Sequence, residues 1–283
     1  MSKTTQQLNA EKLAHLSPSE KRALLAELLR ERASKSTSLE PMSYGQRALW
    51  FLYQLAPENV AYNIAYATSL PADLEITLLQ RALEQLMLRH PILRTTYSQQ
   101  DHAPTQQIHE YQDIVLDVID ASGWNSDTQK RYLIEAAERP FDFRKGPFIR
   151  ASLLTQANNE IQTDVTQTSQ YIFLIVFHHI ALDAWSTKLC IQELWELYTA
   201  IKSKTPPPPQ PKLQYVDYVH WQTEKLSSAA GEQLWQYWYQ HLAGELPELN
   251  LRTDRPRSPL QTYHGAAHLT SLSLLFCQQL RAL

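Results

Sequence analysis

Apolar residues recur at helical spacing in several stretches that polar or proline-containing segments separate. Leu79, Ala82, Leu83 and Leu86 form one such stripe, and Pro91 ends it because proline lacks the amide proton that a continuing helix needs. The same spacing predicts helices over residues 16–33, 43–55, 76–90, 127–139, 185–202 and 231–246, and the start of another at residue 277.

Shorter apolar or alternating runs between these helices predict strands. The clearest run, Tyr171 to Phe177, follows a polar turn over residues 157–170. Helices and strands mix without a regular βαβ period, so the pattern predicts an α/β fold with a mixed sheet flanked by helices, and not a Rossmann fold. The predicted strands cover residues 92–97, parts of 106–120, 148–156, 171–179 and 266–274.

The first predicted helix, residues 16–33, carries strong start signals. Ser17 is a good N-cap, Pro18 suits the first helical position and Glu20 completes a capping box. A helix this short is marginal in water unless its leucine stripe packs on another surface. It packs either on its own domain or on another polypeptide as a docking helix, and the sequence leaves both open.

Composition narrows the function classes. The 283 residues are 43% hydrophobic and 19% charged, which is ordinary for a globular protein with a sizeable core. A net charge of −3 gives no electrostatic case for binding nucleic acid, and the six glycines form no phosphate-binding loop. Two distant cysteines argue against a disulfide framework or a structural zinc site. Without an apolar signal core or a membrane-spanning stretch, we expect a cytoplasmic location and no membrane contact.

The segment "FHHIALDAWS" directly follows the strongest predicted strand. Because side chains alternate across a strand, His178 and His179 should point to opposite sides, so one of them should have a packing role. Two histidines and Asp183 could ligate a metal, but adjacent strand histidines diverge. Ser186 could be a nucleophile, but it lacks the G-x-S-x-G elbow and fits the start of the next helix better.

Two further interpretations of the histidine pair remain. In one, a histidine orients or deprotonates an attacking amine or hydroxyl while both substrates arrive as ligands, so no covalent enzyme intermediate forms. In the other, both histidines are satisfied core residues without a chemical role. These ten residues alone do not decide between the two.

Four motifs together resemble one family. "HHIALDAWS" resembles the H-H-x-x-x-D-G motif of the chloramphenicol-acetyltransferase-like acyltransferases. The other three are similar to motifs of nonribosomal peptide synthetase condensation domains: "SYGQRALWFL" at residues 43–52, "RHPILRTTY" at 89–97 and "YVDYVHW" at 215–221. Their order and spacing agree with that family over residues 38–283. The x-G-Q form of the first motif resembles domains that follow polyketide synthase modules.

The resemblance implies a fold of two similar lobes with a tunnel between them. It also implies amide-bond formation between an acyl or peptidyl thioester and an aminoacyl thioester. The expected partners are the upstream and downstream carrier proteins, whose phosphopantetheine arms carry the substrates, so the chain itself is expected to bind no cofactor and no metal. His179 would be the catalytic histidine, as base or as positioning group, and His178 and Asp183 would organise the site.

Other residues of the four motifs are expected to organise the site or to pack beside it. A partly buried carboxylate needs a cation or several hydrogen-bond donors, and Arg94 is the expected ion-pair partner of Asp183. Ala184 stands where the family has glycine, which would cost about 1–2 kcal/mol if the backbone there has positive φ. The remaining positions are Trp185, Ser186, Gln46, Arg47, Tyr215, Asp217 and Trp221.

The resemblance also divides the chain. Residues 1–38 form a helix and linker that could dock an upstream carrier supplied by another polypeptide, and residues 39–205 form the first lobe. Residues 206–283 hold a proline-rich connector, a crossover helix and the start of a second lobe. Because most of that lobe is missing, we expect the chain to be inactive alone, unless another synthetase module or a separate second lobe completes it. The alternatives are a non-catalytic carrier-docking module and another HHxxxD acyltransferase, such as an epimerisation domain.

Overall fold

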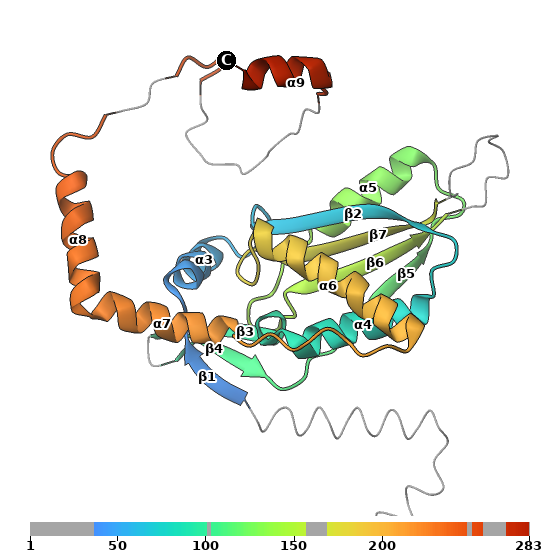
Figure 1. Cartoon of the computed structure of the whole chain (residues 1–283), viewed down its shortest axis with the longest axis horizontal. Coiled ribbons are helices and arrows are strands. Elements are labelled where there is room, and N and C mark those ends of the chain that lie inside the picture. Colours follow the sequence, from blue (N-terminus) through green and yellow to red (C-terminus); the bar gives the residue numbers. More distant parts are fainter. Residues whose placement is uncertain (1–36, 101–102, 157–168, 248–250, 257–269, 283) are drawn as a thin grey trace, which may run out of the picture. The chain divides into compact units, whose positions relative to one another are not determined.

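A computed structural model describes residues 37–100, 103–156, 169–247, 251–256 and 270–282 (Figure 1). The chain divides into two units, one up to Gly244 and one from Glu245 to Leu283. The predicted helix over residues 16–33 and most of the predicted polar turn at 157–170 lie outside the described residues.

The larger sheet of the first unit has four strands in the order β2-β7-β6-β5. Its strands are β2 (Asn63–Pro71), β5 (Leu116–Asp120), β6 (Ile149–Thr155) and β7 (Ser169–His178). β5 and β6 run parallel while the other pairs are antiparallel, so the predicted mixed sheet is confirmed. Figure 1 shows the helices α4 (Ile76–Arg89) and α6 (Ala184–Ser203) crossing one face of this sheet.

A smaller antiparallel sheet stands beside the first, with the order β1-β4-β3. Its strands are β1 (Thr37–Pro41), β3 (Thr95–Gln100) and β4 (Ala103–His109), and a 3₁₀ turn, η1 (Pro91–Arg94), leads into β3. The sequence pattern did not indicate this second sheet. It treated the β1 segment as a break after a helix, and it missed β2 as well.

The core forms where the four-stranded sheet meets the helices. Phe173, Ile175 and Phe177 on one face of β7 are fully buried, and Leu174 and Val176 on the other face are nearly so. A strand buried on both faces reads as a continuous apolar run, which is why this segment was the clearest strand signal in the sequence. The core therefore holds the end of β7, and with it the histidine pair, in a fixed place.

Four further helices complete the described elements of the first unit. α3 (Tyr44–Leu55) and α5 (Ser126–Ala137) confirm two predicted helices, and α7 (Tyr215–Ser227) and α8 (Ala229–His241) follow the proline-rich connector. A Cβ built on Gly231 would lie 2.1 Å from the Leu226 carbonyl oxygen, so the corner between α7 and α8 requires glycine there.

The second unit contains α9 (Leu274–Arg281), which begins where Ser273 accepts a hydrogen bond from the amide of Phe276 at 3.2 Å. The sequence pattern predicted a strand over residues 266–274. Of that span, residues 270–273 are described and carry no strand, and the helix starts at Leu274, so the prediction is wrong for this part. Among the described helices, none is long and apolar enough to cross a membrane.

Candidate active site

His178 is the last residue of β7 and is a buried structural histidine. Its Nδ1 accepts a hydrogen bond from the amide of Ile180 at 3.0 Å, and the ring is 4% exposed. Three phenylalanine rings surround it edge-on, with centroids 4.7–6.0 Å away: Phe141, Phe143 and Phe148. Burial, and then the charges of His179 and Arg150, lower the pKa of His178 to about 3, so the ring stays neutral near pH 7.

His179 follows at once but has the opposite environment. Its backbone amide donates to the carbonyl oxygen of Tyr62 at 2.9 Å, which extends the pairing of β2 and β7 by one step. The side chain is exposed and lines a cavity of about 500 Å³. The cavity is lined by Gly45, Gln46, Leu49, Tyr62, His179, Ile180, Ala181, Leu182, Asp183, Ser186, Tyr215 and Tyr218. The predicted divergence of the two imidazoles is therefore confirmed.

Asp183 is the N-cap of α6. One carboxylate oxygen accepts a hydrogen bond from the amide of Ser186 at 2.7 Å, and the backbone oxygen accepts from the Thr187 hydroxyl at 2.7 Å. The hydrogen bonds from Ser186, with a smaller contribution from the His179 charge, hold the pKa of the Asp183 carboxyl below its usual value.

The expected ion pair between Arg94 and Asp183 is not formed. Arg94 donates instead to the backbone oxygens of Met87 and His109, and burial lowers its pKa. The prediction assumed that the carboxylate is partly buried, whereas Asp183 is exposed and its helix supplies the donors. Arg94 therefore ties α4 to β4 and does not touch the cavity.

The residues after Asp183 begin α6. Ala184 is the first helical residue, and its φ is not among the positive values that the described chain shows. Alanine in the place of the family's glycine therefore carries no backbone penalty here. Trp185 is 70% exposed. Ser186 lines the cavity, and its backbone amide donates a hydrogen bond to the Asp183 carboxylate.

Residues of the first and fourth motifs meet at one wall of the cavity. The hydroxyls of Ser43 and Tyr215 hydrogen-bond at 2.9 Å, and the Tyr44 amide donates to the side chain of Gln222 at 3.0 Å. Burial raises the pKa of the Tyr215 hydroxyl, which therefore stays neutral. These contacts join the start of α3 to α7, although the two segments are about 170 residues apart in sequence.

Of four other motif residues, three bond to nearby or buried groups. Gln46 is 2% exposed and donates to the Tyr97 hydroxyl at 3.0 Å, so it orders the core behind the cavity. Arg47 donates to the Met42 carbonyl oxygen, and Asp217 accepts from the amide of Gln214 at the start of α7. Trp221 is 53% exposed and does not line the cavity.

Sequence reasoning did not name seven of the residues that line the cavity: Gly45, Leu49, Tyr62, Ile180, Ala181, Leu182 and Tyr218. Tyr62 comes into place only because β2 pairs with β7, with Asn63 opposite His178. Nothing in the sequence indicated that pairing. Tyr218 could have been found, because it lies one helical turn after Tyr215, and helical neighbours three apart share a face.

The arrangement provides one exposed imidazole in a cavity of mostly uncharged side chains. The described residues contain no group of three or more histidine, cysteine or acidic side chains that could hold a metal ion. Asp183 and Ser186 are bound to each other through the cap of α6. The geometry therefore suits a histidine that positions, or takes a proton from, a nucleophile that arrives as a ligand.

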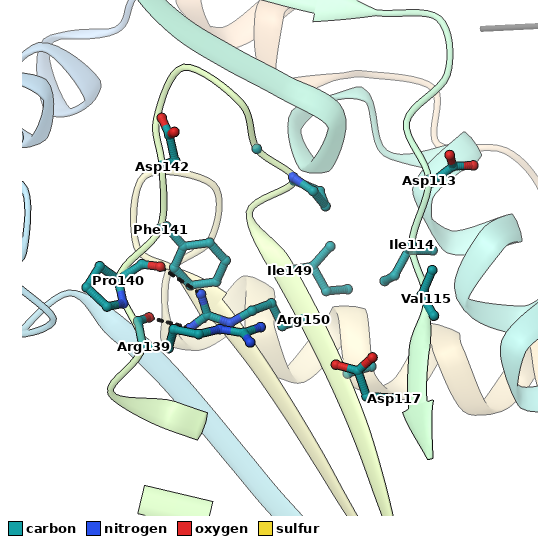
Figure 2. A pocket seen from close by; sticks show the side chains of 13 residues that line it. Asp113, Ile114, Val115, Asp117, Arg139, Pro140, Phe141, Asp142, Ile149 and Arg150 are labelled. Atoms are coloured by element: carbon teal, nitrogen blue, oxygen red, sulfur yellow. Dashed lines mark hydrogen bonds between the residues drawn. The ribbon is translucent and has the colours of Figure 1, made fainter. Parts of the chain in front are cut away.

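A second cavity, of about 300 Å³, lies at the start of β6 and shares no lining residue with the first (Figure 2). Figure 2 shows Arg150 reaching back to the segment after α5, where it donates to the carbonyl oxygens of Arg139 at 2.5 Å and Pro140 at 3.0 Å. Its guanidinium carbon lies 3.8 Å from the centroid of the Phe141 ring. Phe141 also contacts His178, so the packing of Arg150 against Phe141 helps to hold the His178 ring in place.

Comparisons with known proteins agree on one family. A family model described as Condensation domain matches residues 36–283. A linear gramicidin synthase of Brevibacillus parabrevis is 37% identical over 238 residues, which cover 82% of this chain and 3% of that protein. Chondramide synthase cmdD of Chondromyces crocatus is 36% identical over 230 residues, which cover 80% of this chain and 6% of that protein.

Solved structures show the same fold. The starter condensation domain of rhizomide synthetase RzmA has a TM-score of 0.64 at 22% identity, and the match covers 75% of this chain and 51% of that one. The first condensation domain of the CDA synthetase has a TM-score of 0.62 at 18% identity, covering 73% and 51%. The chain thus spans about half the length of these solved domains and a small part of the synthetases that it matches.

Proposed function

The chain belongs to the condensation-domain family of nonribosomal peptide synthetases, and from that membership we propose that it forms amide bonds. The donor is an acyl or peptidyl thioester and the acceptor is an aminoacyl thioester, each held on the phosphopantetheine arm of a carrier protein. The observation that carries the proposal is His179, an exposed imidazole at a cavity of about 500 Å³, fixed by the backbone pairing of β7 with Tyr62.

The reaction needs little covalent help from the protein. The acceptor amine attacks the thioester carbonyl carbon, a C–N bond forms, and the C–S bond breaks as the proton from nitrogen passes to the departing thiolate. His179 acts as the group that orients the amine or takes its proton. A structural relative supports the joint binding of a donor and an acceptor thioester, since a variant of the RzmA starter domain was crystallised with C8-CoA and Leu-SNAC together.

The neighbours of His179 have supporting roles in this proposal. His178 stays neutral and accepts from the amide of Ile180, which holds the turn that presents His179. Asp183 fixes the start of α6 beside the cavity and contributes negative charge near His179. Both would act through position, and neither would exchange a proton with the substrate.

The partners follow from the reaction. An upstream and a downstream carrier protein would each deliver one thioester, and we retain the prediction that residues 1–38 help to recruit the upstream one. Most of those residues lie outside the described part of the chain. Donors made by a polyketide synthase module, which the first motif indicates, stay a prediction as well.

We further infer that the 283 residues alone are inactive in amide formation. The solved domains are about twice as long as the stretch matched here, and α8 exposes large aromatic side chains that a complete domain would be expected to cover. Trp235 is 63% exposed, Trp238 53% and Tyr239 66%.

The test is an amide-product assay by mass spectrometry with a loaded donor carrier and a loaded acceptor carrier. It is run on the 283 residues alone and on the same residues joined to the second half of a solved condensation domain. Product from the joined protein, lost on His179→Ala, supports amide formation. Carrier binding without product from the joined protein would favour a non-catalytic docking module instead. Robust product from the 283 residues alone would contradict the inferred inactivity.

A further inference from the structure

Gly45 occupies an unusual place, because it is the only glycine among the described residues that line the cavity at His179. It is the second residue of α3, between the N-cap Ser43 and the buried Gln46. Leu49, which also lines the cavity, lies four residues later on the same helical face. A side chain at position 45 would therefore stand on the face that borders the cavity.

The backbone does not require glycine at this position. Gly146 and Gly244 have φ of 57° and 88°, in the region that disfavours other residues, but Gly45 is not among the positive-φ glycines. A helix generally prefers alanine to glycine. The neighbour nearest to a Cβ built on Gly45 would be the Ser43 hydroxyl at 3.9 Å, an ordinary contact. Glycine at position 45 therefore leaves open space beside the start of α3.

The walls around this space are tied together. The Ser43 and Tyr215 hydroxyls bond at 2.9 Å, and the Tyr44 amide bonds to Gln222 at 3.0 Å, so both residues before Gly45 are fastened to α7. The cavity therefore cannot widen easily to make room for a larger residue at position 45. Gly45 is exposed and lines the cavity, so a large side chain there would reach into the open space at the cavity's edge.

The lining shows which kind of group would fill the space. Leu49, Leu182 and Ile180 are apolar, Tyr62 and Tyr218 are aromatic, and the lining that the described residues form holds no lysine or arginine. Its carboxylate, Asp183, already accepts from the amide of Ser186. An uncharged, apolar group matches this lining, whereas a charged group would lose water without gaining a partner.

We propose that Gly45 determines specificity: it keeps the cavity deep enough to accept a bulky apolar group of a thioester substrate beside His179. This rests on the proposed function, and it names the substrate class of the same site. The group could belong to the acceptor amino acid or to the donor acyl chain, since the chemistry of the lining is the same for both.

The experiment measures dissociation constants by calorimetry for the full chain and its Gly45→Ala and Gly45→Leu variants. The probes are the N-acetylcysteamine thioesters of leucine, glycine and octanoic acid. The matched controls are Gly123→Ala and Gly123→Leu. A Cβ built on Gly123 meets nothing within 4 Å, so it is no more crowded than one on Gly45, yet Gly123 lines neither cavity described here. The melting temperature of every variant is recorded.

We expect Gly45→Leu to weaken binding of a bulky thioester by about tenfold or more, since a methylene or two decides fit in an apolar pocket. Gly45→Ala should weaken it less, and glycyl thioester should keep its affinity. The melting temperature of Gly45→Ala should equal or exceed that of the unaltered chain, because alanine favours the helix, so unfolding cannot explain the loss. A loss confined to leucyl thioester assigns the space to the acceptor, and one confined to octanoyl thioester assigns it to the donor.

Two results would overturn the proposal in different ways. If the unaltered chain binds bulky thioesters and the Gly45 variants bind them equally well, or lose glycyl thioester to the same degree, Gly45 does not set the depth of the cavity. If the unaltered chain binds none of the three probes, the proposal for Gly45 fails, whereas the amide assay with the joined protein still decides the proposed function.

Discussion

Residues 178 and 179 are both histidine, but their side chains have different environments in the structure. His178 is enclosed by phenylalanine rings and accepts from the backbone of its own turn. His179 is exposed at the cavity, held by a backbone bond to Tyr62. This difference between the two histidines follows from strand geometry, because neighbouring side chains on a strand point to opposite faces. The buried ring makes the turn rigid, and the exposed ring is free to meet a substrate.

The buried state of His178 predicts a pH dependence of folding. Its pKa falls from 6.5 to about 3 in the folded chain, so between these values the unfolded chain binds a proton that the folded chain does not. Stability should therefore drop as pH falls below about 6.5, by about 1.4 kcal/mol per pH unit from this group. Chemical denaturation across this range, compared with His178→Asn, should show a shallower slope in the variant.

NMR can measure the pKa of the His178 ring directly. The ring carbon shift of His178 should stay at its neutral value down to about pH 4, one unit above the lowered pKa. A titration midpoint above about pH 5 would show that the ring is not desolvated, and the structural role given to it here would be wrong.

Asp183 offers a second test at the scale of a residue. Because its carboxylate caps α6, Asp183→Ala should lower the free energy of unfolding by about 1 kcal/mol. Asp183→Asn should stay close to the unaltered chain, since asparagine caps a helix as well. Urea denaturation checks both variants. A large loss in the asparagine variant would mean that the negative charge, and not the cap, holds the site.

At the scale of elements, an ion-pair cluster fastens the proline-rich connector to two helices. Arg89 of α4 pairs with Glu193 of α6 and donates to the carbonyl oxygens of Pro208 at 3.0 Å and Pro209 at 2.6 Å. His90 donates to the other oxygen of Glu193 at 2.6 Å. The connector leads directly to α7, so this cluster controls where α7 and its cavity residues start.

Removing one partner of this ion-pair cluster should lower the free energy of unfolding. Glu193→Gln leaves Arg89, whose side chain is 4% exposed, without its counter-charge, and we expect a loss of about 3 kcal/mol. The control is Lys202→Met, which removes pairs with Asp73 and Glu75 that are largely exposed, and it should cost less than about 1 kcal/mol. Equal losses in the two variants, measured by urea denaturation, would contradict the role given to Glu193.

The elements that could be predicted are those whose sequence pattern decides their structure locally. α3, α4, α6 and β7 follow from helical spacing, caps and a continuous apolar run. β1 and β2 could not be found, because they are strands through pairing with distant segments and β2 is mostly exposed or half-buried. For the same reason the sequence indicated His179 and Asp183 but neither Tyr62 nor the true partners of Arg94.

For the whole molecule, the described part of the first unit builds the histidine site from segments that span residues 45–218. The site therefore depends on the complete fold of that unit and not on one motif. We therefore expect the first unit to unfold in a single cooperative transition, measured by circular dichroism. A broad transition with aggregation in size-exclusion chromatography would show that the exposed aromatic residues of α8 need a cover before the site is stable.

The most direct test of the central claim is the rate of amide formation with His179→Ala in the 283 residues joined to a second condensation half. If His179 positions or deprotonates the acceptor amine, the rate should fall by about 100-fold or more while the melting temperature stays unchanged. An alanine variant that is folded and keeps its rate would contradict the account, because the exposed imidazole would then have no part in the chemistry.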